Sequence, residues 1–129
     1  MSEVTEALTR LPLFAGCPPG ELQRVVRYAH EERAAAGEPI VTQGERGALF
    51  FAVLEGTVDV EREGNVLRTF GPGDFFGETA LIAHAPRNAS IRATTPVRLA
   101  VLPARDFRAS VGRFPAVYDA VLQAVAERI

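Results

Sequence analysis

The chain has 129 residues, with 14 basic and 16 acidic side chains, a net charge of −2 and 47% hydrophobic residues. This length and composition predict one domain with a buried core. Every basic side chain is arginine, which excludes a Schiff-base or Walker A lysine, and one cysteine cannot hold an iron–sulfur cluster or a thiolate zinc site. A net charge near zero also argues against direct nucleic-acid binding, which usually needs a basic surface.

Membrane and export signals are absent from the sequence. The longest apolar run, Ala48–Leu54, is far shorter than the roughly 18 residues of a membrane span, so no membrane insertion is expected. The acidic N-terminus lacks the apolar core of a signal peptide, and the single Cys17 fits a reducing compartment. We therefore expect a cytoplasmic location.

The first expected element is an amphipathic helix. Apolar residues follow Pro18–Gly20 at helical spacing, and they are Leu22, Val25, Val26 and Ala29. Proline in the first turn of a helix fits this interpretation, because its missing N–H would have no partner there.

Short strands are expected in the middle of the chain. Eight of the 11 glycines lie within residues 37–77, with β-branched and aromatic residues between them, which is typical of a β sandwich or barrel. Thr57–Glu61 alternates apolar and polar residues, Glu63–Asn65 predicts a hairpin turn, and Val66–Phe70 predicts the returning strand. Two further strands are expected at Ser90–Ala93 and Val97–Leu102.

Two helices are expected after these strands. The first begins at Pro103, carries Phe107 and Val111, and should end with Gly112 in the C′ position. The second begins at Pro115 and keeps a helical apolar period to the end of the chain, through Val117, Tyr118, Val121, Leu122, Val125 and Ile129. This apolar face must pack on the barrel, on a ligand or on a second copy of the chain.

The segment 71–93 combines groups that suit a sugar phosphate. Gly77 lets the backbone approach a ligand, and the N–H groups of the expected turn at Glu78–Ile82 favour an anion. Arg87 could close on that anion as a charge-assisted, bidentate partner. Glu78 could accept a hydrogen bond from a sugar hydroxyl.

The motifs Phe76–Leu81 and Pro86–Ser90 resemble the phosphate-binding cassette of cyclic-nucleotide-binding domains. These domains occur in the catabolite activator protein, in regulatory subunits of cyclic-AMP-dependent kinase and in cyclic-nucleotide-gated channels. The resemblance covers nearly the whole chain. Leu11–Phe14 is similar to the N-terminal motif of the family, and Gly37–Glu45 and Phe50–Val58 are similar to its first strands.

The resemblance implies a mainly β fold with flanking helices. It is a jelly-roll-like β-roll with N-terminal helices and two C-terminal helices, and Phe107 and Pro115 lie where these two helices begin. A single domain would then span residues 1–129. It would comprise a helical segment to about residue 30, the β-roll at 31–102 with its cassette at 71–93, and closing helices at 103–129.

The same resemblance implies a role for individual residues. Arg87 would pair with the cyclic phosphate, and Glu78 would accept a hydrogen bond from the ribose 2′-hydroxyl. Backbone N–H groups near Gly77, Glu78 and Ala80 would complete the cradle. The expected ligand-binding residues are Gly77, Glu78, Thr79, Ala80, Arg87, Asn88, Ala89 and Ser90, with Val60 and Leu67 against the purine.

Asn88 departs from the pattern of the family, which often has alanine, threonine or serine after the arginine. A small residue there goes with cyclic AMP, and a threonine helps to hold the guanine of cyclic GMP. The asparagine carbonyl could act like that hydroxyl, but its bulk could also crowd the site. We expect cyclic AMP rather than cyclic GMP as the ligand, with no catalytic cofactor and no metal.

The resemblance also implies a regulatory output. The helix from Pro115 would move onto the base when the ligand binds, and it could also form a homodimer. Two alternatives belong to other classes. One is a ligand-free interaction or dimerisation domain with the same fold. The other is a metal-dependent β-barrel enzyme, which we do not expect, because His30 and His84 are far apart in sequence and no Gly-x-Ser-x-Gly motif is present.

Overall fold

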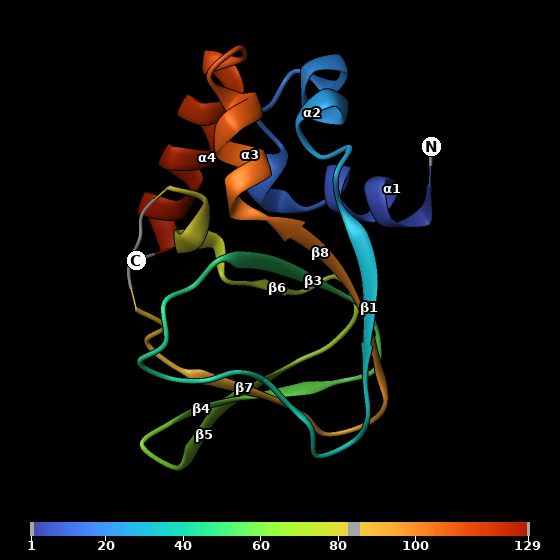
Figure 1. The fold of residues 1–129 in the computed structure, drawn as a ribbon, viewed down its shortest axis with the longest axis vertical. Coiled ribbons are helices and arrows are strands. Elements are labelled where there is room, and N and C mark those ends of the chain that lie inside the picture. Colours follow the sequence, from blue (N-terminus) through green and yellow to red (C-terminus); the bar gives the residue numbers. More distant parts are fainter. Residues whose placement is uncertain (1, 83–85, 129) are drawn as a thin grey trace.

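The computed structural model describes residues 2–82 and 86–128, and Figure 1 shows helices gathered at one end of a two-sheet β structure. The elements in chain order are α1 (Glu3–Thr9), η1 (Pro12–Phe14), α2 (Pro19–Val25), β1 (His30–Ala34), β2 (Pro39–Val41), β3 (Leu49–Glu55), β4 (Val58–Arg62), β5 (Asn65–Phe70), β6 (Phe75–Phe76), η2 (Glu78–Leu81), β7 (Ser90–Ala93), β8 (Val97–Pro103), α3 (Ala104–Val111) and α4 (Pro115–Arg128). The expected fold class, mainly β with helices at both ends, is confirmed. Ala83, His84, Ala85 and Ile129 lie outside the described residues.

The strands form two four-stranded antiparallel sheets, ordered β1-β8-β3-β6 and β2-β7-β4-β5. Side chains from both sheets meet in one apolar core, which includes Phe51 and Phe76 from the first sheet and Val58 and Ile91 from the second. The rings of Phe51 and Phe76 stack with their centroids 4.8 Å apart. We call this cluster the intersheet core.

Strands β3 and β8 are buried on both faces. In β3, Phe51 and Val53 face the intersheet core, and the alternate residues Phe50 and Ala52 join a second core beneath the helices. We call this second cluster the helical core. Strand β8 repeats the arrangement, with Val97, Leu99 and Val101 in the first core and Ala100 and Leu102 in the second. Burial on both faces explains why the stretches 49–54 of β3 and 99–102 of β8 are continuously apolar and do not alternate.

The helical core collects residues from every helix. Leu8 of α1, Phe14 of η1, Leu22 of α2 and Phe107 of α3 are all almost fully buried there. The apolar stripe of α4 joins them through Val117, Val121 and Val125, each 0% exposed. Its partner is therefore this chain's own N-terminal segment, since α4 contacts η1, whereas Leu122 remains 41% exposed.

One predicted helix end was wrong, and one predicted helix cap has another conformation. The helix expected to reach Ala29 ends at Val25, because the chain turns there to enter β1, and Ala29 donates its N–H to Val26 in that turn. Gly112 caps α3 with a φ of −59°, not in the left-handed conformation expected of a C′ glycine. Backbone bonds from Arg113 to Ser110 and from Phe114 to Val111 close the last turn without it.

The predicted hairpin between β4 and β5 is present, with Glu63 and Gly64 as its two-residue turn. Both have positive φ, 54° and 82°, which is the type I′ geometry that matches strand twist. A glutamate in this conformation is strained, and Gln43 braces it by accepting its N–H and donating to its carboxylate, each at 3.1 Å. The turn therefore depends on a contact that is distant in sequence.

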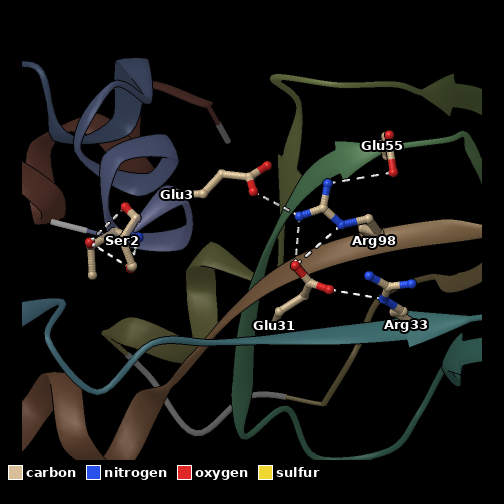
Figure 2. A network of polar contacts seen from close by, with 7 residues as sticks. Ser2, Glu3, Glu31, Arg33, Glu55 and Arg98 are labelled. Carbon is tan, nitrogen blue, oxygen red and sulfur yellow. Dashed lines mark hydrogen bonds and ion pairs between the residues drawn. The ribbon is translucent and has the colours of Figure 1, made fainter.

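An ion-pair cluster fastens the N-terminal helix to the first sheet (Figure 2). Arg98 of β8 donates to Glu31 of β1 at 2.6 Å and to Glu3 of α1 at 2.9 Å, and lies 3.5 Å from Glu55 of β3. Arg33 adds a 2.9 Å bond to the same Glu31 carboxylate. The two guanidinium groups hold the pKa of Glu31 at about 2, far below its usual range.

This cluster should make folding stability depend on pH. The folded-state pKa of Glu31 is depressed, so its stabilisation is complete above the ordinary carboxyl pKa of about 4.3 and is lost as pH falls towards 2. We expect Glu31→Gln to lower the melting temperature at pH 7, with the deficit shrinking between about pH 5 and pH 2. Thermal unfolding of the wild type and of Glu31→Gln across this pH range measures the difference in melting temperature. The exposed Glu38, which forms no ion pair within the described residues, is the control as Glu38→Gln. A deficit that is the same at every pH would contradict the prediction.

Candidate ligand-binding site

A pocket of about 220 Å³ lies between the cassette and the β4–β5 hairpin. Eight of the ten expected residues line it: Gly77, Glu78, Thr79, Arg87, Asn88, Ala89, Val60 and Leu67. The other two do not. Ala80 is 2% exposed in the helical core, and Ser90 accepts a 2.8 Å hydrogen bond from the Gln43 N–H. The fold therefore brings most of the sequence-predicted residues to one place.

Arg87 is fixed in this pocket through its backbone and its side chain. Its N–H donates to the Glu45 carbonyl at 2.6 Å, and its own carbonyl accepts from Gly44 at 2.8 Å. The guanidinium Nη2 donates to the carbonyl of Leu49 at 2.6 Å. With both ends held, the guanidinium is positioned before any ligand arrives.

Two glycines make room for this guanidinium. A Cβ on Gly77 would lie 2.6 Å from Arg87 Nη1, and a Cβ on Gly47 would lie 2.7 Å from both Cζ and Nε. Gly77 also has a φ of +83°, which side chains disfavour, but Gly47 is not among the positive-φ glycines. Gly47 is therefore required by the close approach of Arg87 and not by its own backbone conformation.

Arg87 is a half-buried cation that forms no ion pair within the described residues, although the charge of Glu78 acts on it. Burial lowers the pKa of its guanidinium, and the negative charge of Glu78 opposes that effect. No ion pair joins Arg87 to a carboxylate in residues 2–82 and 86–128, and the Leu49 carbonyl is neutral. Because a buried charge is costly unless it is paired, this site suits an anionic ligand.

The cassette turn offers further hydrogen-bonding groups. Gly77 precedes the four-residue turn η2, and its carbonyl accepts from Ala80 at 3.1 Å. In a turn of this kind the first N–H groups, here those of Glu78 and Thr79, point away from the carbonyl groups of the turn. The carboxylate of Glu78 adds acceptors beside the Arg87 donors, so the pocket can bind an anion and a hydroxyl together.

The opposite wall, formed by β4 and β5, carries two aliphatic side chains. Val60 of β4 and Leu67 of β5 both line the pocket, with Leu67 51% exposed at its mouth. They do not pair directly, because Val60 faces Arg68 and the register shifts between Val60 and Glu61. This offset places two aliphatic side chains along the wall, which suits a flat, apolar ring system.

Sequence reasoning missed several contributors to the pocket, among them two groups that position Arg87 and two further arginines. Gly47 and the Leu49 carbonyl hold Arg87, as described above. Arg62 and Arg68 line the pocket, with Arg62 Nε donating to the Asn88 carbonyl at 2.9 Å. A backbone carbonyl has no side-chain signature, and the two arginines look like ordinary polar positions of exposed strands. For Gly47 a signal was available, because it belongs to the glycine cluster.

Across residues 2–82 and 86–128, no three histidine, cysteine, aspartate or glutamate side chains gather in a way that could hold a metal ion. Within the same residues, no helix combines the length and the apolar character needed to span a membrane. No described residue of α4 lines the pocket.

Comparison with known proteins agrees with this geometry. The sequence model named "Cyclic nucleotide-binding domain" matches residues 31–113. A cyclic nucleotide-gated potassium channel of Mesorhizobium japonicum is 35% identical over 95% of this chain and 34% of its own length. The cyclic AMP receptor protein of Thermus thermophilus is 31% identical over 92% of this chain and 57% of its own length. The chain thus spans only about a third to a half of these two relatives.

Solved structures confirm the fold. The N-terminal domain of a transcriptional regulator from Streptomyces coelicolor superposes with a TM-score of 0.81 and 31% identity, covering 95% of this chain and 91% of that one. The catabolite activator protein of Thermus thermophilus gives a TM-score of 0.77 and 32% identity, covering 91% of this chain and 57% of that one. The resemblance inferred from the sequence motifs is confirmed, and this chain belongs to the cyclic nucleotide-binding domain family.

Proposed function

We propose that the pocket binds a cyclic nucleotide and that the chain acts as a regulatory sensor module without catalytic activity. The observation that carries this proposal is Arg87, a half-buried guanidinium with no carboxylate partner within residues 2–82 and 86–128. A cyclic phosphate carries the single negative charge that would neutralise it. Leu49 accepts from only one of its nitrogens, so donors of the guanidinium fork remain for phosphate oxygens.

The other groups of the pocket fit the remaining parts of such a ligand. Glu78 would accept a hydrogen bond from the ribose hydroxyl, and the first N–H groups of η2 would add donors to the phosphate. Val60 and Leu67 would cover a face of the base. An interaction domain that binds no ligand is less favoured, because it leaves the buried charge of Arg87 without a role.

We propose that the pocket prefers cyclic AMP to cyclic GMP as its ligand. Asn88 stands at the exposed edge of the pocket, where its backbone carbonyl is already bonded by Arg62. Cyclic GMP is the alternative, and Arg62 and Arg68 on the pocket wall support it, because an arginine fork can pair with O6 and N7 of guanine. Parallel titrations with the two nucleotides decide between them.

We propose that ligand binding changes the position of the last helix. In this structure α4 packs on η1, and its described residues lie outside the pocket, so covering the base would require α4 to move. A ligand can drive that movement only by as much as its affinity differs between the two positions. Dimerisation through α4 has less support, because Val117, Val121 and Val125 are already buried within this chain.

Removing the Arg87 side chain tests nucleotide binding directly. We expect Arg87→Ala to cost about 2–5 kcal/mol of binding free energy, a loss of at least roughly 30-fold in affinity, because the phosphate loses its buried partner. Calorimetric titration with cyclic AMP and with cyclic GMP measures it. Arg105→Ala, at an exposed arginine of α3, is the matched control. Equal affinities of Arg87→Ala and the wild type would refute the assignment.

Gly47 tests whether the position of the Arg87 guanidinium matters for binding. We expect Gly47→Ala to push the guanidinium out of place, because the new Cβ would lie 2.7 Å from Cζ. Nucleotide affinity should then fall about tenfold or more, or about 1.4 kcal/mol. Gly20→Ala is the control, since nothing lies within 4 Å of its added Cβ. A Gly47→Ala protein that binds as tightly as Gly20→Ala would contradict this role.

A further inference from the structure

Helix α3 contacts the cassette turn η2 on the side that faces away from the pocket. Arg108 of α3 donates from Nη2 to the carbonyl oxygen of Ala80 at 2.7 Å, and the guanidinium is partly buried. Ala80 and Leu81 are 2% and 0% exposed in the helical core, which they share with Phe107. One side of η2 therefore lines the pocket through Glu78 and Thr79, and the other side belongs to the helical end of the molecule.

The bond from Arg108 differs from the apolar contacts around it. The carbonyl of Ala80 lies in the last turn of η2, where carbonyl groups lack partners within the turn. A charged donor there forms a stronger and more directional bond than a neutral donor would. Leu81 and Phe107 fill space and tolerate sliding, whereas a 2.7 Å hydrogen bond fixes one atom of the cassette relative to α3.

We propose that Arg108 is the positioning residue that couples the cassette to the C-terminal helices. It holds η2 where its N–H groups and Glu78 meet the ligand, and it carries a displacement of η2 into α3, which continues into α4 after Arg113 and Phe114. This inference rests on the proposed function, and it adds the specific bond through which occupancy of the pocket reaches the helices.

Because of thermodynamic linkage, this role can be tested through the response of α3 to the ligand and through the affinity for the ligand. If the ligand alters the position of α3 through the bond, then loss of the bond must alter the affinity for the ligand. A chain without the bond could still close its cassette on a nucleotide, but α3 would no longer follow. The apolar contacts of Leu81 and Phe107 would remain, so the fold should survive the substitution.

Hydrogen exchange on the full chain, measured with and without saturating cyclic AMP, separates these effects. In the wild type we expect the nucleotide to change amide exchange in η2 and also in α3 and α4. In Arg108→Met the change should persist in η2 and be lost in α3 and α4, and the dissociation constant should rise about tenfold, as for loss of a charged hydrogen bond. Arg108→Lys, which keeps a charged donor, should restore part of the helix response.

The matched control is Arg105→Met, at an exposed arginine of the same helix, which should behave as the wild type. Wild-type affinity together with a full response of α3 and α4 in Arg108→Met would overturn the proposal. An equal loss in Arg105→Met would overturn it as well, since the effect would then follow any change of charge on α3. If Arg108→Met does not fold, thermal unfolding will show it. The proposal is then decided by comparing the exchange response of α3 and α4 in Arg108→Lys with the response in Arg105→Met.

Failure of the proposed function has a different signature. A wild-type chain that binds neither cyclic AMP nor cyclic GMP would refute nucleotide binding. The positioning role of the hydrogen bond from Arg108 to Ala80 can then still be tested in the ligand-free protein. The probes are the amides of Ala80 and Ile82, which donate to Gly77 and Thr79 within the turn. Faster exchange at these two amides in Arg108→Met than in Arg105→Met supports the positioning role, and equal exchange overturns it.

Discussion

The site depends on one constraint, which is the placement of a guanidinium partly out of water with only a backbone carbonyl to hold it. Arg87 donates to Leu49, is held through its backbone by Gly44 and Glu45, and needs the missing side chains of Gly47 and Gly77. Burial destabilises the charged form of Arg87, and no carboxylate of the described residues pairs with it. Within the described residues, the Arg87 guanidinium therefore has no direct ion pair and feels the charge of Glu78 only without such contact, and an anionic ligand would relieve the cost of its burial.

The rest of the β structure keeps that guanidinium in place. Leu49, whose carbonyl accepts from Arg87, begins β3, and β3 is one of the two strands that are buried on both faces. A carbonyl at the start of such a strand has little freedom to move, because both cores pack against the residues that follow it. The rigid sheet therefore supplies one fixed acceptor, and the loop that carries Arg87 is anchored to the turn at Gly44 and Glu45.

Much of this architecture could be predicted from local sequence patterns, because local rules decide it. The hairpin at Glu63–Gly64 follows from turn chemistry. The last helix begins at Pro115 as expected, and α3 begins one residue after the expected Pro103, which caps it. The family motif identified Arg87 and Glu78 as site residues, and both line the pocket. The end of α2 was mispredicted, since four apolar residues at helical spacing do not reveal where the chain must turn into a strand.

What the sequence could not predict depends on contacts between distant segments. The need for glycine at Gly47 arises only when Arg87, forty positions later, folds against it, and the Leu49 carbonyl has no signature in any side chain. The exclusion of Ala80 from the pocket follows from the same kind of contact, since its side chain is taken into the helical core. A motif identifies the loop that meets a ligand, but only packing decides which atoms of that loop face outwards.

The position of the cassette between the two cores supports the proposal that one turn serves both ligand binding and its transmission to the helices. Phe75 packs in the helical core and the next residue, Phe76, packs in the intersheet core, because successive side chains of a strand point to opposite faces. Gly77 follows directly, so the turn that lines the pocket starts at the boundary of the two cores. A ligand that displaces this turn would act against the intersheet core, which is built from two paired sheets. The helical core joins helices through side-chain packing, so in the proposed relay it is the part that yields, and movement at the pocket would be directed towards α3 and α4.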